Sequence, residues 1–100
     1  MSLTGLAKQV DKNALYISPS MSATHGRTEM IVNGQYLTFH SKNYIGELKT
    51  ILSTINSTNA KTIYLEDQNF GSKLVAHRLS NFGFVVAWYR VKNGKIVHVN

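Results

Sequence analysis

The 100-residue sequence lacks cysteine altogether and contains a single proline. Without cysteine there is no disulfide framework, no thiolate nucleophile and no cysteine-ligated metal or iron–sulfur site. No apolar run approaches the roughly 18 residues that a membrane span needs. The first residues show neither a long apolar stretch nor a leading cluster of positive charge, so we expect no secretory signal. These absences predict a cytoplasmic protein that does not contact membranes.

Acidic side chains are also scarce, and this scarcity sets the net charge. Eleven Lys and Arg residues stand against five Asp and Glu residues, which gives a formal net charge of +6 and a pI near 9.8. Such a balance favours polyanions, because lysine and arginine displace counterions from phosphates. No two Lys or Arg residues are adjacent, so there is no basic tail. A purely solubilising role for the charge is the competing interpretation.

The chain has enough apolar content to form a core. Hydrophobic residues make up 43% of it and aromatic residues 10%. With this length, the composition predicts one domain spanning residues 1–100 and excludes a disordered chain or a coiled coil.

Two Asn-Gly pairs mark the clearest local structures. Each pair accepts the positive φ values that a type I′ hairpin turn demands. We therefore expect two β-hairpins, centred on Asn33-Gly34 and Asn93-Gly94. The β-rich runs that they join are 28–32 with 35–40, and 84–91 with 96–99.

Apolar spacing predicts two helices. The first runs from 43 to 57, begins at Ser41 or Asn43 as its cap, and leaves Glu47 outside its apolar stripe. The second runs from 69 to 82. Its expected inner face consists of Leu74, Val75, Leu79 and Phe82.

Strands at 14–18 and 61–66 and a short helix at 3–10 complete the expected pattern. The fold class is α/β (α+β): a small mixed sheet of five or six strands, two Asn-Gly hairpins, and two helices packed mainly on one face. That packing leaves the other sheet face with little cover. Uncovered apolar area has to meet solvent, a ligand or a second subunit, so we expect a homodimer.

The order of three strands, a helix, a strand, a helix and a strand resembles the opening order of the ribonuclease H-like fold. Active members of that family carry an essential Asp in the first strand, whereas the run 14–18 has no carboxylate. Glu66 and Asp67 fall near the end of the fourth strand, where such folds often keep an acid. One acidic pair cannot clamp two metal ions, so the resemblance implies a metal-dependent nuclease only as an alternative. The other role for Asp67 is that of a helix cap.

Other catalytic motifs are missing from the sequence. It contains no GxSxG, no HExxH and no phosphate-binding glycine loop. The four histidines lie on separate predicted segments. They are His25, His40, His77 and His98. We therefore expect no enzyme activity, no cofactor and no metal site.

Basic residues of the C-terminal third form the principal binding candidate. Lys73 and His77 lie one turn apart on the second helix, and further cations follow on the last hairpin. The predicted nucleic-acid-binding residues are Lys73, His77, Arg78, Arg90, Lys92 and Lys95. His25, Arg27 and Lys42 extend the set. Trp88, between the two groups, belongs either to the core or to a surface on which bases stack.

These observations predict a small basic non-enzymatic binding protein that contacts nucleic acid or a nucleic-acid-processing complex. The alternative is a protein-interaction module, such as a phage-encoded inhibitor of a host factor. A small metal-dependent nuclease is the second alternative. The abundance of Asn, Thr, Ser, Ile and Lys is typical of an accessory protein from an AT-rich bacterial or phage genome.

Overall fold

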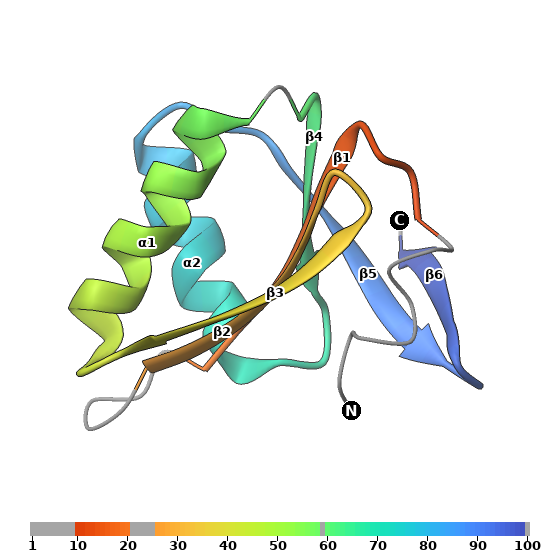
Figure 1. Cartoon of the computed structure of the whole chain (residues 1–100), viewed down its shortest axis with the longest axis horizontal. Coiled ribbons are helices and arrows are strands. Elements are labelled where there is room, and N and C mark those ends of the chain that lie inside the picture. Colours follow the sequence, from red (N-terminus) through yellow and green to blue (C-terminus); the bar gives the residue numbers. More distant parts are fainter. Residues whose placement is uncertain (1–9, 21–25, 59, 100) are drawn as a thin grey trace.

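The computed structural model describes residues 10–20, 26–58 and 60–99 (Figure 1). The strands are β1 (Ala14–Pro19), β2 (Gly26–Val32), β3 (Gln35–Ser41), β4 (Thr62–Glu66), β5 (Val86–Lys92) and β6 (Lys95–Val99), and the helices are α1 (Tyr44–Ser57) and α2 (Phe70–Asn81). All strands and both long helices expected from the sequence are present, with bounds that move by up to two residues. The short helix expected at 3–10 lies outside the described residues, apart from Val10.

The six strands form one mixed sheet in the order β3-β2-β1-β4-β5-β6. β1, β4 and β5 are parallel neighbours, and every other adjacent pair is antiparallel. The chain reaches β4 from β3 through α1, and β5 from β4 through α2, because parallel strands need a connection that crosses a face of the sheet. The expected mixed sheet is thus confirmed, and the element order on which the ribonuclease H-like resemblance rests is present.

Both Asn-Gly pairs form two-residue loops. Asn33 and Asn93 each have a φ of 53°, and the glycines that follow them have φ values of 77° and 71°. Two consecutive residues with positive φ are the requirement of a type I′ turn, whose twist matches that of the strands it joins. The loops connect β2 to β3 and β5 to β6, so both hairpins have the expected register.

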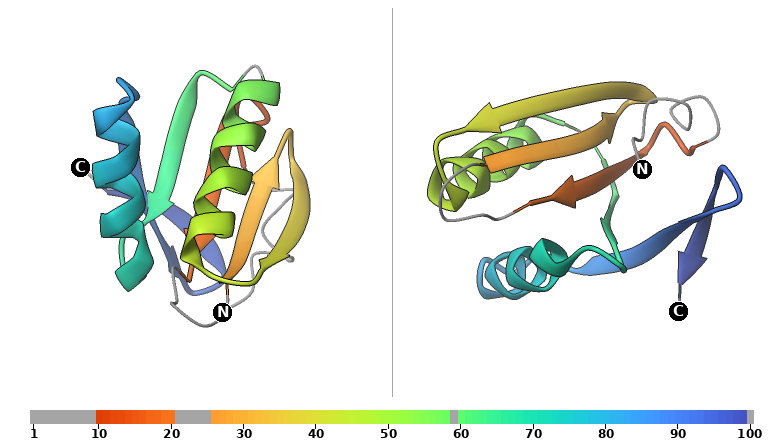
Figure 2. Two further views of the ribbon diagram at one scale, coloured as in Figure 1. Left: turned by 90° about the vertical axis from the view of Figure 1, so that its left-hand side faces the viewer. Right: turned by 90° about the horizontal axis from the view of Figure 1, so that it is seen from below.

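The two helices lie on the same side of the sheet, with β4 visible between them in Figure 2. Beneath them is the larger core, in which side chains from alternate strand positions meet the inner faces of the helices. Its buried members are Leu15, Ile17, Met30, Ile51, Ile63, Leu65, Val75 and Leu79. No helix in the described part of the chain is long and apolar enough to cross a lipid bilayer.

The opposite face of the sheet holds a second, aromatic cluster. Ala14, Tyr16, Ile31 and Tyr89 are at most 2% exposed there. The rings of Tyr16 and Tyr64 stack at 4.9 Å, while Tyr89 meets Tyr16 edge-on at 5.3 Å. Large aromatic rings bury much apolar area without a helix, so this face has cover of its own at its centre.

One prediction about α1 is wrong. Asn43 caps the helix as expected, since its side-chain oxygen accepts from the backbone N–H groups of Ile45 and Gly46. Glu47, however, does not face solvent and is only 1% exposed. The first turn of α1 crosses the start of β2, where the Glu47 carboxylate accepts hydrogen bonds from nearby donors. These bonds offset the hydration that the carboxylate loses on burial.

The expected inner face of α2 is also wrong in part. Val75 and Leu79 are fully buried as predicted, but Leu74 is 45% and Phe82 62% exposed. The buried positions Ser72, Val75 and Leu79 follow steps of three and four residues. Leu74 is one position from Val75 and therefore turned by about 100° away from the sheet. Phe82 is the C-cap of the helix and Phe84 packs against the core in its place.

Candidate functional site

The strand order creates a crevice where β1 and β4 end. The two strands are parallel neighbours, so their carboxyl ends share one edge of the sheet, which we call the carboxyl edge. After β1 the chain turns to β2 on one side, and after β4 it passes through α2 to β5 on the other side. Connections that diverge in this way leave a gap at the strand ends, which is the usual ligand position in open α/β sheets.

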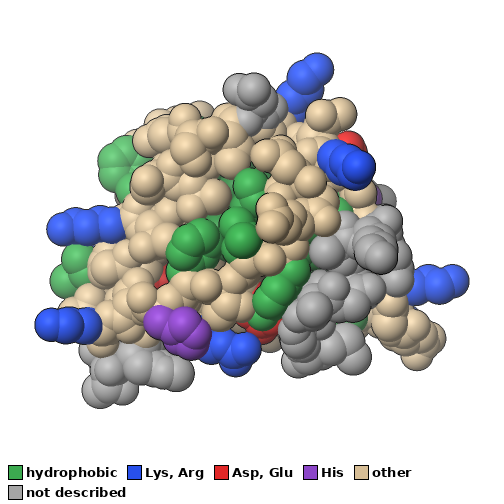
Figure 3. All heavy atoms as spheres, viewed as in Figure 1, with side chains coloured by type: hydrophobic (Ala, Val, Ile, Leu, Met, Phe, Trp, Pro, Cys, Tyr) green, Lys and Arg blue, Asp and Glu red, His purple; other side chains and the backbone are tan. Residues whose placement is uncertain are grey.

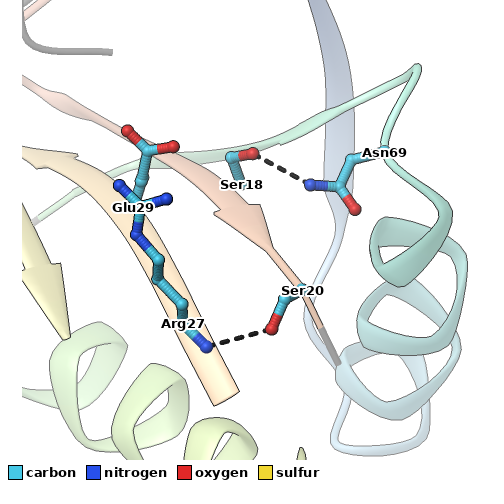
Figure 4. A pocket seen from close by; sticks show the side chains of 5 residues that line it. All are labelled: Ser18, Ser20, Arg27, Glu29 and Asn69. Carbon is cyan, nitrogen blue, oxygen red and sulfur yellow. Dashed lines mark hydrogen bonds between the residues drawn. The ribbon is translucent and has the colours of Figure 1, made fainter. Parts of the chain in front are cut away.

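A shallow polar pocket of about 200 Å³ occupies this position (Figure 4). Three segments contribute to it: the end of β1, the start of β2 and the residue before α2. The lining residues are Ser18, Ser20, Arg27, Glu29 and Asn69. Two hydroxyls, an amide, a guanidinium and a carboxylate among these residues can bind a polar ligand.

Hydrogen bonds between these segments fix the pocket walls. The Asn69 amide donates to Oγ of Ser18 at 3.0 Å, and its oxygen accepts from the N–H of Gly71 as the N-cap of α2. Across the pocket, the backbone N–H of Arg27 donates to Oγ of Ser20 at 2.9 Å. Each bond joins a strand end to another element, so the pocket is held by the fold rather than by a single loop.

Glu47 lies behind the pocket and ties α1 to β1 and β2. Its Oε2 accepts from the backbone N–H of Ser20 at 2.8 Å and from the Thr28 hydroxyl at 2.5 Å. Its Oε1 accepts from the Ser20 hydroxyl at 3.2 Å. A buried carboxylate needs such donors to offset its lost hydration, and here they engage both oxygens. Glu47 therefore acts as an internal support of the pocket.

Polar groups continue across the sheet face opposite the helices. Ser18 is paired with Glu29 of β2, and Glu66 is paired with Tyr89 of β5. The β1–β4 register brings Ser18 beside Glu66, so the four side chains form one row near the carboxyl edge. Oε2 of Glu66 and the Tyr89 hydroxyl are buried without a hydrogen-bond partner in the described structure. Burial, and after it the charge of Glu66, raises the pKa of Tyr89.

The acidic pair Glu66 and Asp67 is split between two environments. Glu66 belongs to the row just described, whereas Asp67 accepts a 2.7 Å hydrogen bond from Nε of Arg90 in an ion pair. The suggested capping role of Asp67 is wrong, because Asn69 is the cap of α2. Within residues 10–20, 26–58 and 60–99, no three acidic or histidine side chains are placed to hold a metal ion. The residues present there do not fit the metal pair of the nuclease alternative.

All six predicted nucleic-acid-binding residues have exposed side chains, but they do not form one group. α2 runs antiparallel to β4 and β5, so Lys73 in its first turn lies near the carboxyl edge. Arg78 is in its last turn, toward the opposite edge, with His77 between them. Arg90, Lys92 and Lys95 lie where β5 and β6 run beyond the carboxyl edge, and Lys92 is paired with Lys95 across the hairpin.

The structure describes two of the three basic residues that extend the predicted set. Arg27 lines the pocket, and Lys42 follows β3, which ends at the carboxyl edge as well. Trp88 is half-buried against the helix-side core, in line with the core interpretation of this residue. His25 lies outside the described residues.

An aromatic assembly that the sequence did not indicate joins β1, β4 and β6. The hydroxyl of Tyr16 and Nε2 of His98 are 3.0 Å apart, a hydrogen bond between residues 82 positions apart. The Tyr64 ring stacks on both, at 4.9 Å from Tyr16 and 4.5 Å from His98. These contacts attach the edge strand β6 to the centre of the sheet.

Most of the pocket is not apparent from the sequence. Arg27 was a candidate only for its charge, and Ser18, Ser20, Glu29 and Asn69 were not candidates at all. The available signal was positional, since Asn69 follows the predicted parallel strand 61–66. The neighbours of the pocket residues in space became apparent only with the strand order. Compared with protein-family models, curated proteins and solved structures, the chain has no match in any of the three.

Proposed function

We propose that this protein is a small non-enzymatic binding protein that contacts nucleic acid, in the cytoplasm, through the carboxyl edge of its sheet. The observation that carries the proposal is a row of cations from separate segments, spread along this edge from the end of β3 to the β5–β6 hairpin. They are Arg27, Lys42, Lys73, Arg90, Lys92 and Lys95. Their side chains are all exposed, as phosphate contacts require.

Internal contacts engage two of the acids near this edge. Glu47 is buried and receives three hydrogen bonds from the part of the chain that the structure describes, and Asp67 is paired with Arg90. A carboxylate engaged in this way repels a phosphate less than a free one at the same distance. The net charge of +6 adds a long-range attraction that accelerates encounter and weakens with salt.

The cations are dispersed. In Figure 3, hydrophobic side chains lie in the middle of the face viewed, and separate Lys and Arg side chains project at its margins. Such spacing suits several single contacts along a phosphate backbone better than a pocket for one multiply charged anion. The polar pocket beside Arg27 lies next to these contacts and offers hydrogen bonds to a sugar or a base edge.

Salt titration with charge-matched variants tests this proposal. One variant reverses Arg27, Lys92 and Lys95 to Glu, and its control reverses Lys12, Lys49 and Lys61, which are exposed away from the carboxyl edge. Each reversal removes two charges, so both variants have a formal net charge of 0 instead of +6. Labelled duplex DNA, single-stranded DNA and RNA are each titrated at several salt concentrations.

The wild type is expected to bind with a log–log salt slope of roughly −3 to −5, about −0.9 for each phosphate contact on duplex DNA. The edge variant should lose binding near physiological salt, while the control retains more of it. Equal losses of affinity in both variants would show that net charge alone determines nucleic-acid binding and that the carboxyl edge is not a specific site. Absence of wild-type binding to all three nucleic acids at about 50–100 mM salt would refute the proposal, since non-specific contacts are strong there.

We also propose that the protein is a homodimer. The sheet has two edge strands, β3 and β6, whose outer backbone groups can pair with another strand. On β6 the side chain of Val97 is 44% exposed, which favours this edge.

A further inference from the structure

We propose that the outer surface of α2 is a second binding site, and that it takes an acidic amphipathic helix of a protein partner. We define this surface by its exposed residues. They are Lys73, Leu74, His77, Arg78, Phe82 and Val85. The inference goes beyond nucleic-acid binding, because it concerns another class of partner and a surface that shares only Lys73 with the carboxyl edge.

Apolar exposure is the first observation. Phe82 is 62% exposed, Val85 88% and Leu74 45%. Leu74, Arg78 and Phe82 follow one another in steps of four residues, so they lie along one side of α2. Between Leu74 and Phe82 the helix rises by about 12 Å. Val85 follows in the link to β5 and extends the row past the end of the helix.

The second observation is the charge of the same surface. Residues 70–81 contain three basic side chains, Lys73, His77 and Arg78, and no acidic one. Lys73 and His77 lie one turn apart beside the apolar row. In Figure 2 the two helices stand apart, with β4 visible between them. The surface thus combines the positive charge of Lys73 and Arg78 with exposed apolar side chains.

This combination selects a protein over a nucleic acid. A phosphate backbone offers no apolar counterpart to these side chains, and an unpaired base that stacked on Phe82 would still leave the aliphatic side chains of Leu74 and Val85 uncovered. Protein interfaces, in contrast, are enriched in Phe and Arg at their centres. Charge complementarity then requires an acidic partner, and a second copy of this chain would bring like charges together. A helix with an apolar stripe fits the straight row of side chains on α2, as ridges of one helix pack into grooves of another.

The probe for the test is a capped synthetic peptide of 18 residues that places leucines on one helical face and glutamates on the other. Its control has the same composition with the leucines distributed around the helix. Affinity is measured by calorimetry, and the contact surface by amide chemical-shift changes in the ¹⁵N-labelled full chain. The amphipathic peptide should bind about tenfold more tightly than its control, and the shifts should centre on α2.

Variants separate this surface from the carboxyl edge. Phe82→Ser with Val85→Ser should weaken peptide binding about tenfold or more and leave nucleic-acid binding unchanged. Lys92→Glu with Lys95→Glu should do the reverse. Both serine substitutions are at exposed positions, so the thermal midpoint should be retained, and the single variant Val85→Ser supplies the test if it is not.

Three results would overturn the inference. The first is equal affinity for the two peptides, which would leave charge as the only attraction, or no binding of either peptide, which would show no attraction at all. The second is a set of shifts centred on the β5–β6 hairpin. The third is a loss of DNA or RNA binding in the serine variants, which would assign the surface to nucleic acid.

Discussion

The Thr28 hydroxyl and the Glu47 carboxylate, 19 residues apart in the chain, form a buried hydrogen bond of 2.5 Å between β2 and α1. The same carboxylate receives the backbone N–H of Ser20. Strand, helix and pocket wall therefore depend on one side chain, and its conformation is set by donors from two other segments.

Replacing Glu47 by Gln tests this dependence. The amide group replaces one carboxylate oxygen by a donor, so the Ser20 or the Thr28 hydroxyl has to turn from donating to accepting, and all three hydrogen bonds lose a charged acceptor. We expect a stability loss of about 1–3 kcal/mol, and about 4–8 °C in thermal midpoint for each kcal/mol in a domain of this size. Lys49→Gln, on the exposed side of the same helix, is the control and should shift the midpoint by little. An unchanged midpoint for the Glu47 variant would mean that the carboxylate is dispensable.

Gly26 should not tolerate a side chain. A Cβ at this position would approach the backbone oxygen of Asn43 at 2.8 Å and Cβ of Glu47 at 3.1 Å. The backbone oxygen belongs to the start of α1, so the helix itself would have to shift. We expect Gly26→Ala to cost about 1–3 kcal/mol in chemical denaturation, in the range of other overpacked sites. A wild-type midpoint with alanine would show that α1 can move away from β2 freely.

Stability should fall at alkaline pH because of Tyr89. Burial raises the pKa of its phenol above the ordinary 10.0. Above about pH 10 the Tyr89 phenol therefore loses its proton in the unfolded state but keeps it in the folded state. The free energy of unfolding thus includes the full contribution of Tyr89 below that pH, and this contribution declines as the pH rises. The slope is at most about 1.4 kcal/mol per pH unit for one phenol.

Tyr89→Phe should reduce that slope and leave neutral stability unchanged or raised, since the hydroxyl is buried without a partner in the described structure. Urea denaturation between pH 8 and 11 provides the measurement for both proteins. Identical slopes would show that other groups cause the alkaline loss.

Removing the acidic pair should leave binding intact. In Glu66→Gln with Asp67→Asn, the exposed ion pair to Arg90 is lost, at a cost of about 0–1 kcal/mol. We expect retained or tighter nucleic-acid binding, and no cleavage of labelled RNA or DNA by the wild type with Mg²⁺ or Mn²⁺. Divalent-ion-dependent cleavage that disappears in the double variant, at an unchanged thermal midpoint, would instead establish the nuclease alternative.

The homodimer proposal predicts twice the monomer mass of 11.2 kDa by sedimentation equilibrium at micromolar concentration. Val97→Lys should shift the equilibrium toward monomer if β6 forms the contact, because a charged side chain on an edge strand opposes pairing. A wild type that sediments as a strict monomer would rule out the dimer.

The sequence by itself determined the local elements. Asn33-Gly34 and Asn93-Gly94 specify their turns because each pair accepts positive φ, whatever surrounds it. Asn43 begins α1 for a similar reason, since its side chain reaches N–H groups only two and three residues away. Net charge and the absence of known catalytic motifs are likewise properties of composition and order.

Only the tertiary structure decided which faces are buried and which residues meet. Both Leu74 and Val75 are apolar neighbours on α2, and packing against the sheet buries one and exposes the other. Glu47 is buried although its type favours solvent, because Ser20 and Thr28 supply donors to it. The pocket joins Ser18 to Asn69 across 51 residues, and Tyr16 meets His98 across 82. Such contacts follow from strand order and register, which depend on the simultaneous packing of distant segments and not on the dihedral preferences of any one of them.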